Sequence, residues 1–343
     1  MAGPSSLNDL RAVQRLQSQG LELDYERARL WPHTAFSAAL AARLPFNEIG
    51  ATTVVLYHTN GNRRPLGFVQ ARMRRKRPEA DLSFIAPSLA AQADVVTIWY
   101  RLLSELTNVL CEKGCQRIYA QVPVDGDAEQ VLRQAGFNVF AHEDVYLLGP
   151  ERIKSFPRPV GPRVLRRQRS RDGWNLLRLY NAATPRLVQQ AEGMVSGEGK
   201  LGKLGDWWEQ ANGVGYVLEG RADGGLVGAA RVTRGRAANW LRLYLHPEAN
   251  QGAGELVCGA LSLVNTSLPR PVYCSVRDYE GGIRNWLELS GFELQFKRSL
   301  MVKHATVRVK EPAVWAVPAL EKPAPIVHTR THVQEWEKEH VRA

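Results

Sequence analysis

Long apolar runs and a leader-like beginning are both missing from this chain of 343 residues. No stretch approaches the roughly 18 consecutive apolar residues that would suggest a membrane-spanning helix. The first nine residues, MAGPSSLND, contain neither the basic segment nor the apolar segment of a secretory signal. From these absences we expect no membrane association and a cytoplasmic location.

Cysteine is scarce, with four residues in the whole chain. Cys111 and Cys115 lie near the end of an expected helix, whereas Cys258 and Cys274 are scattered. A zinc ribbon needs two close Cys/His pairs, which this spacing does not provide. The cysteines therefore predict no metal site, and their number fits a reducing compartment.

Acidic residues are outnumbered, and the net charge is +11. This balance favours an anionic partner, which could be nucleic acid, a membrane surface or a phosphorylated cofactor. Two basic runs, residues 72–77 and 163–171, carry much of the excess. Charge runs usually face water, and no aromatic residues interleave with these as they do in nucleic-acid modules. We interpret both as solvated loop charge and do not expect a nucleic-acid partner.

What the chain does contain is a long internal repeat. It reads Val131-Leu-Arg-Gln-Ala-Gly-Phe137 in the first half and Trp286-Leu-Glu-Leu-Ser-Gly-Phe292 in the second. The two Gly-Phe pairs are 155 residues apart (291 − 136), and Tyr119 and Tyr273, which begin the matching strands, are 154 apart (273 − 119). A period this long exceeds the roughly 20–50 residues of a solenoid unit. The repeat therefore indicates a whole domain present twice.

Hydrophobic periodicity predicts the same order of elements in both halves. The first half is expected to contain helices near residues 6–20 and 35–44, strands 52–58 and 66–73 around an Asn60-Gly61 turn, strand 81–85, helix 91–113, strand 117–122, helix 128–135 and strand 139–148. The second is expected to contain helices 172–183 and 185–191, a glycine-rich loop 193–205, strands 216–219, 226–233 and 239–245, helix 256–264, strand 272–276, helix 283–289 and strand 293–303.

This order of elements, with a short helix ending in Gly-Phe before the last strand, resembles the GNAT-type N-acetyltransferase family in two tandem copies. The resemblance implies an α/β (α+β) fold with two tandem GNAT-like domains, each a mixed, mainly antiparallel central sheet flanked by helices. We expect an N-terminal domain at 1–150, a linker at 151–162, a C-terminal domain at 163–310, and a Pro-rich, charged and poorly ordered tail at 311–343.

In that family a glycine-rich turn between a strand and the long helix holds the pyrophosphate of acetyl-CoA, and backbone N–H groups at a helix start suit an anion. In the second half Gly252-Ala253-Gly254 resembles this turn, although Ala249 stands where the family has Arg or Gln. The resemblance makes these residues candidates for acetyl-CoA binding: Leu245, Asn250, Gln251, Gly252, Ala253, Gly254 and Glu255. The alternative is a flexible strand-to-helix connection.

The first half differs at the matching place, because residues 87–94 contain no glycine. We interpret this stretch as an ordinary helix start capped by Ser88. The cofactor loop of the first copy is therefore predicted to be degenerate, and the C-terminal copy is the candidate acetyl-CoA site.

The resemblance also implies a reaction site. The thioester would lie where strands 239–245 and 272–276 splay apart, and the pantetheine would pair with the first strand. Many family members have a tyrosine acid four residues before the Gly of Gly-Phe, but the matching residues here are Leu132 and Leu287. Tyr279 is the nearest substitute, with a packing or turn residue as the alternative. Arg277 and Asp278 are interpreted as a surface pair.

Two functions remain open at this point. The first is an N-acetyltransferase that moves an acetyl group from acetyl-CoA, its co-substrate, to an unidentified amine, without a metal. The second is a catalytically decayed tandem GNAT-like protein that binds acyl-CoA or serves as a scaffold, which the missing tyrosine in both halves motivates.

Overall fold

The computed structural model describes most of the chain between residues 7 and 305. The described stretches are residues 7–42, 50–58, 64–74, 77–91, 94–154, 165–194, 213–220, 225–249, 252–264 and 269–305. The chain divides into two compact units, residues 1–307 and residues 308–343. All described residues belong to the first unit, and the tail expected at 311–343 lies outside them.

The N-terminal half follows the predicted order and adds a short strand and a short helix near its start. Its elements are α1 (Leu7–Leu16), β1 (Leu21–Glu22), α2 (Tyr25–Leu30), α3 (Ala35–Ala41), β2 (Thr52–Tyr57), β3 (Pro65–Met73), β4 (Glu79–Ala86), α4 (Val95–Glu112), β5 (Arg117–Pro123), α5 (Asp127–Gln134) and β6 (Asn138–Leu148). The apolar stripe of α4 packs on β2 and β3, as helical periodicity predicts. The predicted Asn60-Gly61 turn lies outside the described residues.

The C-terminal half repeats this plan. Its elements are α6 (Pro150–Lys154), β7 (Arg166–Arg167), α7 (Gly173–Ala183), α8 (Arg186–Ala191), β8 (Gly213–Glu219), β9 (Leu226–Arg234), β10 (Asn239–Leu245), α10 (Ala253–Val264), β11 (Val272–Arg277), α11 (Gly281–Leu289) and β12 (Glu293–His304). The glycine-rich loop expected at 193–205 falls mostly outside the described residues.

The repeated Gly-Phe phrase has the same backbone role in both halves. Gly136 and Gly291 have φ angles of +89° and +83°, the left-handed conformation in which glycine ends a helix. Phe137 and Phe292, 1% and 3% exposed, then enter the two cores. The phrase therefore marks a helix end followed by a core anchor.

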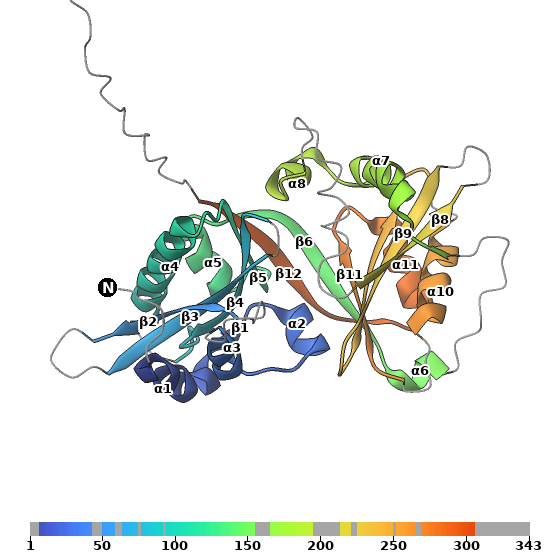
Figure 1. The fold of residues 1–343 in the computed structure, drawn as a ribbon. Helices are drawn as coiled ribbons and strands as arrows, with labels where there is room; N and C mark the ends of the chain where they lie inside the picture. Colours follow the sequence, from blue (N-terminus) through green and yellow to red (C-terminus); the bar gives the residue numbers. More distant parts are fainter. Residues whose placement is uncertain are drawn as a thin grey trace, which may run out of the picture. The chain divides into compact units, whose positions relative to one another are not determined.

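The last strand of each half joins the sheet of the other half. The order along the sheet is β2-β3-β4-β5-β12-β6-β11-β10-β9-β8-β7. Residues 298–304 of β12 pair with β5, and residues 143–148 of β6 pair with β11. Figure 1 shows β6 and β12 as long neighbouring strands that pass between the two halves.

Each hydrophobic core is completed by the exchanged strand. Met301 of β12 is fully buried in the core under α4, and Leu148 of β6 is fully buried in the core under α10. Burial of such apolar side chains is the main stabilising term of a fold. Each half therefore depends on the other for part of its stability.

The predicted fold class is confirmed: a large, mainly antiparallel sheet carries helices on its faces. The interpretation of residues 72–77 as a solvated run is wrong for the members that the structure describes. Arg72, Arg74 and Arg77 pair with Asp24, Asp81 and Glu79 at N–O distances of 3.2, 2.6 and 2.8 Å. Arg77 is 9% exposed, because β4 places carboxylates beside the run.

Candidate functional site

The parallel pair β10–β11 opens into a gap at its carboxyl end. The pairing begins at Asn239 and ends where Arg242 faces Ser275. The following residues, Leu243 to Leu245, pair with β9 on their other side. Their backbone edge toward β11 therefore has no strand partner among the described residues. Such an edge can accept an extended ligand that hydrogen-bonds like an added strand.

The matching gap in the N-terminal half is filled by the chain itself. β4 and β5 pair in parallel only as far as Asp81, which faces Tyr119. Past that point the edge of β4 pairs with β1 in antiparallel fashion, with Leu21 opposite Ile85. The two halves thus share the splay between parallel strands and differ in what lies beside it.

Two backbone hydrogen bonds extend the pairing between β1 and β4 beyond the ends of β1. The Leu23 amide donates to the Ser83 carbonyl at 2.9 Å, and the Ser88 amide donates to the Gln19 carbonyl at 2.6 Å. A Cβ at Gly20 would lie 2.8 Å from the Ile85 carbonyl oxygen, so glycine permits this close approach. We call residues 19–23 the gap-filling segment.

The described candidate cofactor residues of the C-terminal half lie at the end of β10 and at the start of α10. Gly252 and Ala253 are buried, while Leu245, 8% exposed, buries its side chain in the core and leaves only its backbone available. Asn250 and Gln251 lie outside the described residues. The structure therefore brings the end of β10 and the start of α10 together, as the resemblance implies.

Gly254 has a packing role of its own. A Cβ at this position would lie 2.9 Å from the ring of Trp286 on α11, so α10 and α11 need a glycine here. Glu255 lies half-buried in the first turn of α10. A carboxylate stabilises a helix start, but its negative charge also weakens binding of an anion there.

The start of α4 in the N-terminal half has no cap from Ser88. The helix begins at Val95, after Asp94, and Ser88 makes its backbone bond to the gap-filling segment. The prediction that Ser88 caps this helix is therefore wrong. Trp99, fully buried, donates its indole N–H to the Pro87 carbonyl at 2.8 Å.

A buried network of charged side chains lies on one face of the C-terminal strands. Because side chains alternate along a strand, Trp240, Arg242 and Tyr244 point away from the core residues Leu241 and Leu243. This polar face, which we define by Arg242, Tyr244 and the residues that contact them, lies opposite α10. It adjoins the gap, since Tyr244 belongs to the unpaired stretch of β10.

Glu143 lies at the centre of the polar face and comes from the exchanged strand β6. It accepts a hydrogen bond from Arg298 Nε at 2.7 Å and pairs with Arg242. Burial would raise its pKa, but the charges of Arg298, Arg242 and Arg277 prevail and lower it to about 2. Glu143 is therefore ionised at neutral pH, although it is only 4% exposed.

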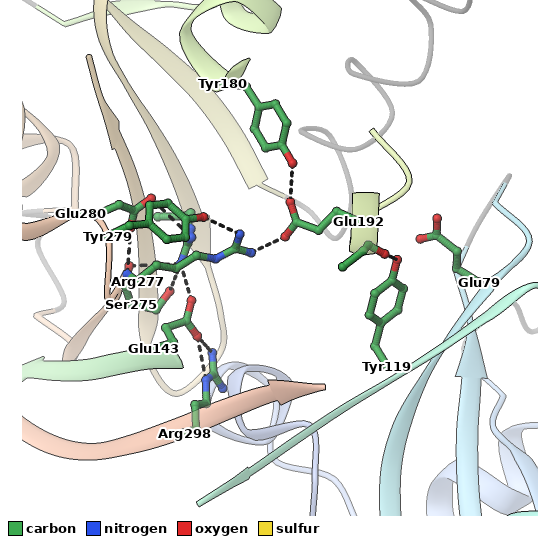
Figure 2. Close-up of polar contacts among 12 residues, drawn as sticks. Glu79, Tyr119, Glu143, Tyr180, Glu192, Ser275, Arg277, Tyr279, Glu280 and Arg298 are labelled. Atoms are coloured by element: carbon green, nitrogen blue, oxygen red, sulfur yellow. Dashed lines mark hydrogen bonds and ion pairs between the residues drawn. The ribbon is translucent and has the colours of Figure 1, made fainter. Parts of the chain in front are cut away.

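Glu192, at the end of α8, connects the polar face to the N-terminal half, as Figure 2 shows. Its carboxylate pairs with Arg277 and accepts the Tyr180 hydroxyl at 2.6 Å. Its backbone carbonyl accepts from Arg77 Nη2 at 3.1 Å, and the neighbouring Ala191 carbonyl accepts from Tyr119 at 3.0 Å. This single turn is therefore fixed from both halves.

Tyr279 follows β11 and lies beside the same network. Arg277 Nη1 donates to its hydroxyl oxygen at 2.8 Å, which leaves the phenol hydrogen available for another acceptor. Burial raises the pKa of Tyr279, so the phenol is protonated at neutral pH. Its position, two residues beyond β11, lies at the same end of the sheet as the gap.

The interpretation of Arg277 and Asp278 as a surface pair is wrong for Arg277. Asp278 is exposed and lies 3.5 Å from His142, whereas Arg277 is 7% exposed and holds Glu192. The alternation of β11 could have indicated this, because Tyr273, Ser275 and Arg277 share one face. The sequence gives no sign of Glu143 or Glu192 as partners, since both come from distant elements.

Twelve described strands in one sheet, two parallel splays at equivalent positions, and a helix after each are now established. A GCN5-related N-acetyltransferase from Sphaerobacter thermophilus is similar in structure: it is 12% identical, with a TM-score of 0.50 over 89% of this chain and 95% of its own. The fold is that of a tandem GCN5-related N-acetyltransferase.

Two further solved structures are similar to this chain. A tandem GNAT protein from the clavulanic acid biosynthesis pathway is 12% identical, with a TM-score of 0.50 over 89% of this chain and 97% of its own. A functionally unknown protein from Staphylococcus epidermidis, also 12% identical, has a TM-score of 0.51 over 77% and 99%. No protein-family model and no curated protein matches the sequence. Identities this low establish the fold alone.

The described residues contain no group of three or more His, Cys, Asp or Glu side chains arranged to hold a metal ion. None of their helices combines the length and the apolar character that a membrane crossing requires.

Proposed function

We propose that the chain is an acyl-CoA-dependent N-acyltransferase, specifically an N-acetyltransferase that moves an acetyl group from acetyl-CoA to an amine. The observation that carries this proposal is the open backbone edge of Leu243 to Leu245, beside the start of α10, in a tandem GNAT fold. Acetyl-CoA would bind in the C-terminal half. In the N-terminal half the gap-filling segment already occupies the equivalent edge.

The residues of the C-terminal half fit acetyl-CoA in two respects. The edge of β10 would offer backbone groups to the amides of a pantetheine arm, and the first N–H groups of α10 would be available to a diphosphate. Glu255 opposes the diphosphate, so the affinity depends on backbone donors rather than on a basic loop. Bound acetyl-CoA would supply an activated thioester carbonyl beside the polar face.

Tyr279 is the proposed proton donor. Acyl transfer releases a thiolate, which an acid at hydrogen-bond distance stabilises. The phenol is protonated at neutral pH and is oriented by Arg277. Leu287, where the family often has tyrosine, is fully buried and apolar. The acetyl-CoA residues, Tyr279 and a cytoplasmic location all remain proposals.

Isothermal titration calorimetry of the full chain with acetyl-CoA tests the proposal. We expect one molecule bound per chain, because one of the two gaps is filled. No heat of binding at millimolar acetyl-CoA would refute acyl-CoA use, and two molecules per chain would refute the filled gap. One-to-one binding without turnover over a broad amine panel would instead identify a decayed acyl-CoA-binding protein.

A further inference from the structure

Helix α2 joins the two halves and is held at both ends. At its start Asp24 accepts from the Arg27 amide at 3.3 Å and pairs with Arg72 of β3 at 3.2 Å. At its end the Leu30 carbonyl accepts from the Ala237 amide, before β10, at 3.1 Å. The gap-filling segment immediately precedes α2, so the backbone ladder on β4 also limits its movement.

Helix α2 lies on the polar face of the C-terminal half. The Tyr25 ring makes edge contacts with Trp240 of β10, Tyr273 of β11 and Phe296 of β12, at centroid distances of 6.3, 6.1 and 4.5 Å. Trp240 shares its face with Arg242. The N-terminal half thereby supplies a helix to the face that borders the open gap of the other half.

Glu26 is the acidic residue in the first turn of α2. Its side chain is half-buried, and it makes no hydrogen bond or ion pair to any residue in the described ranges. The carboxylates of Glu143, Glu192 and Glu280 on the same face all have arginine partners or backbone donors. Glu26 is therefore a carboxylate with unused acceptor capacity.

Glu26 follows Tyr25 in α2, the helix whose Tyr25 ring packs on the polar face. Burial raises its pKa, and the charges of Arg231 and Arg298 oppose that shift without cancelling it. Arg231 faces Arg242 across β9 and β10, which is the last position before the unpaired edge begins. One of the arginines whose charge acts on Glu26 thus stands at the position where the gap starts.

We propose that Glu26 binds the amino group of the acceptor, so that the substrate is a cationic amine held by one half against the acyl group bound by the other. This inference rests on the proposed function and assigns a residue that the GNAT resemblance does not supply. Arg242, Arg277 and Arg298 already have carboxylate partners, whereas Glu26 keeps a carboxyl group that a bound ammonium would favour in its charged form. It therefore favours an amine over an acidic acceptor.

The experiment uses pairs of CoA thioethers, which need no knowledge of the natural acceptor. One series carries a primary amine at the end of an alkyl arm on the CoA sulfur, with arms of increasing length, and the matched series carries plain alkyl arms. Calorimetry on the full chain should give tighter binding of the best amine probe, by at least about tenfold, because hydrogen bonds to charged groups are strong.

The Glu26→Gln variant should lose this preference and bind both series equally within about twofold, as a neutral amide cannot neutralise an ammonium. Its affinity for the plain alkyl probes should stay unchanged, which also shows that the variant is folded. Glu26→Asp should retain part of the preference. The control Glu112→Gln, at an exposed position at the end of α4, should behave like the unaltered chain.

The outcomes separate the two proposals. If neither series binds, acyl-CoA binding itself is refuted. If both series bind and the amine preference survives in Glu26→Gln, or is absent from the unaltered chain at every arm length, the role of Glu26 is refuted while acyl-CoA binding stands.

Discussion

The two halves have the same order of strands and helices but differ at the same point of the sheet. Beside β4 the chain's own residues 19–23 complete the edge, whereas beside β10 the equivalent edge has no strand partner among the described residues. Glycine at position 20 allows the filling strand to approach Phe84 and Ile85. One gap is thus part of the structure, and the other is the proposed ligand site.

The segments before the two helices also differ in their contacts. Before α4, the Trp99 indole donates to the Pro87 carbonyl and the Ser88 amide donates to the Gln19 carbonyl. The start of α10 follows Gly252 and has no equivalent cover from the gap-filling segment. The comparison teaches that a duplicated fold can keep its architecture while a single added segment fills the gap of one copy.

The largest expected effect comes from removing the Glu143 carboxylate, which the N-terminal half contributes to the polar face of the C-terminal half. Glu143→Gln leaves Arg298 and Arg242 buried without their anion, which should lower the free energy of unfolding by about 3–5 kcal/mol. Urea denaturation followed by fluorescence and circular dichroism should give one coincident transition, because each core contains a strand of the other half. Two separate transitions would contradict that interdependence, and Glu112→Gln is the control.

The same residue gives a pH dependence with a defined sign. The pKa of Glu143 is lowered from 4.5 to about 2 in the folded chain, so its contribution is complete above about pH 4.5 and is lost as the pH falls toward 2. The contribution amounts to at most about 3 kcal/mol. The stability difference between the unaltered chain and Glu143→Gln should therefore shrink over this acidic range, and a constant difference would contradict the assignment.

A next smaller effect is expected from blocking each helix start with a large side chain. Gly252→Trp should weaken acetyl-CoA binding at least about 100-fold, because the indole would cover the first amides of α10. The matched change Ala91→Trp, at the exposed turn before α4, should alter the affinity less than about twofold. Calorimetry measures both, and a thermal melt of Gly252→Trp checks its fold. Equal losses of acetyl-CoA affinity in the two variants would contradict the proposal that acetyl-CoA binds in the C-terminal half alone.

The smallest effect is expected from disturbing the gap-filling segment. Gly20→Val would force a side chain against Phe84 and the Ile85 carbonyl, and overpacking of this kind costs about 1–3 kcal/mol. Urea denaturation should show this loss, whereas Gly149→Val, whose Cβ meets nothing within 4 Å, should show much less. Acetyl-CoA affinity should remain within about threefold in both. Unchanged stability in Gly20→Val would mean that residues 19–23 do not hold the edge of β4.

The sequence predicted the fold class because the doubled Gly-Phe phrase and the periodicity of the long helices are local signals. It did not predict the exchange of β6 and β12, since two strands with similar patterns fit either sheet equally well. It also missed β1 and α2, which lie within residues 21–30. Both elements are too short and too polar to show a hydrophobic period. Their structure depends on contacts with β4, Trp240 and Phe296.

The sequence pointed to a candidate site only where a motif exists. The end of β10 and the start of α10 meet as the resemblance implies, but the contact of Gly254 with Trp286 shows that a glycine pattern can reflect helix packing. Glu143, Glu192 and Glu26 escaped prediction because each reaches the polar face from a different part of the chain. No local pattern connects such residues.

A crystal structure of the full chain with acetyl-CoA tests the central contrast most directly. We expect one molecule, with its pantetheine arm along the edge of Leu243 to Leu245 and its diphosphate at the start of α10, while β1 stays paired with β4. Acetyl-CoA density between β4 and β5 with residues 19–23 displaced, or no density at either gap, would contradict the account.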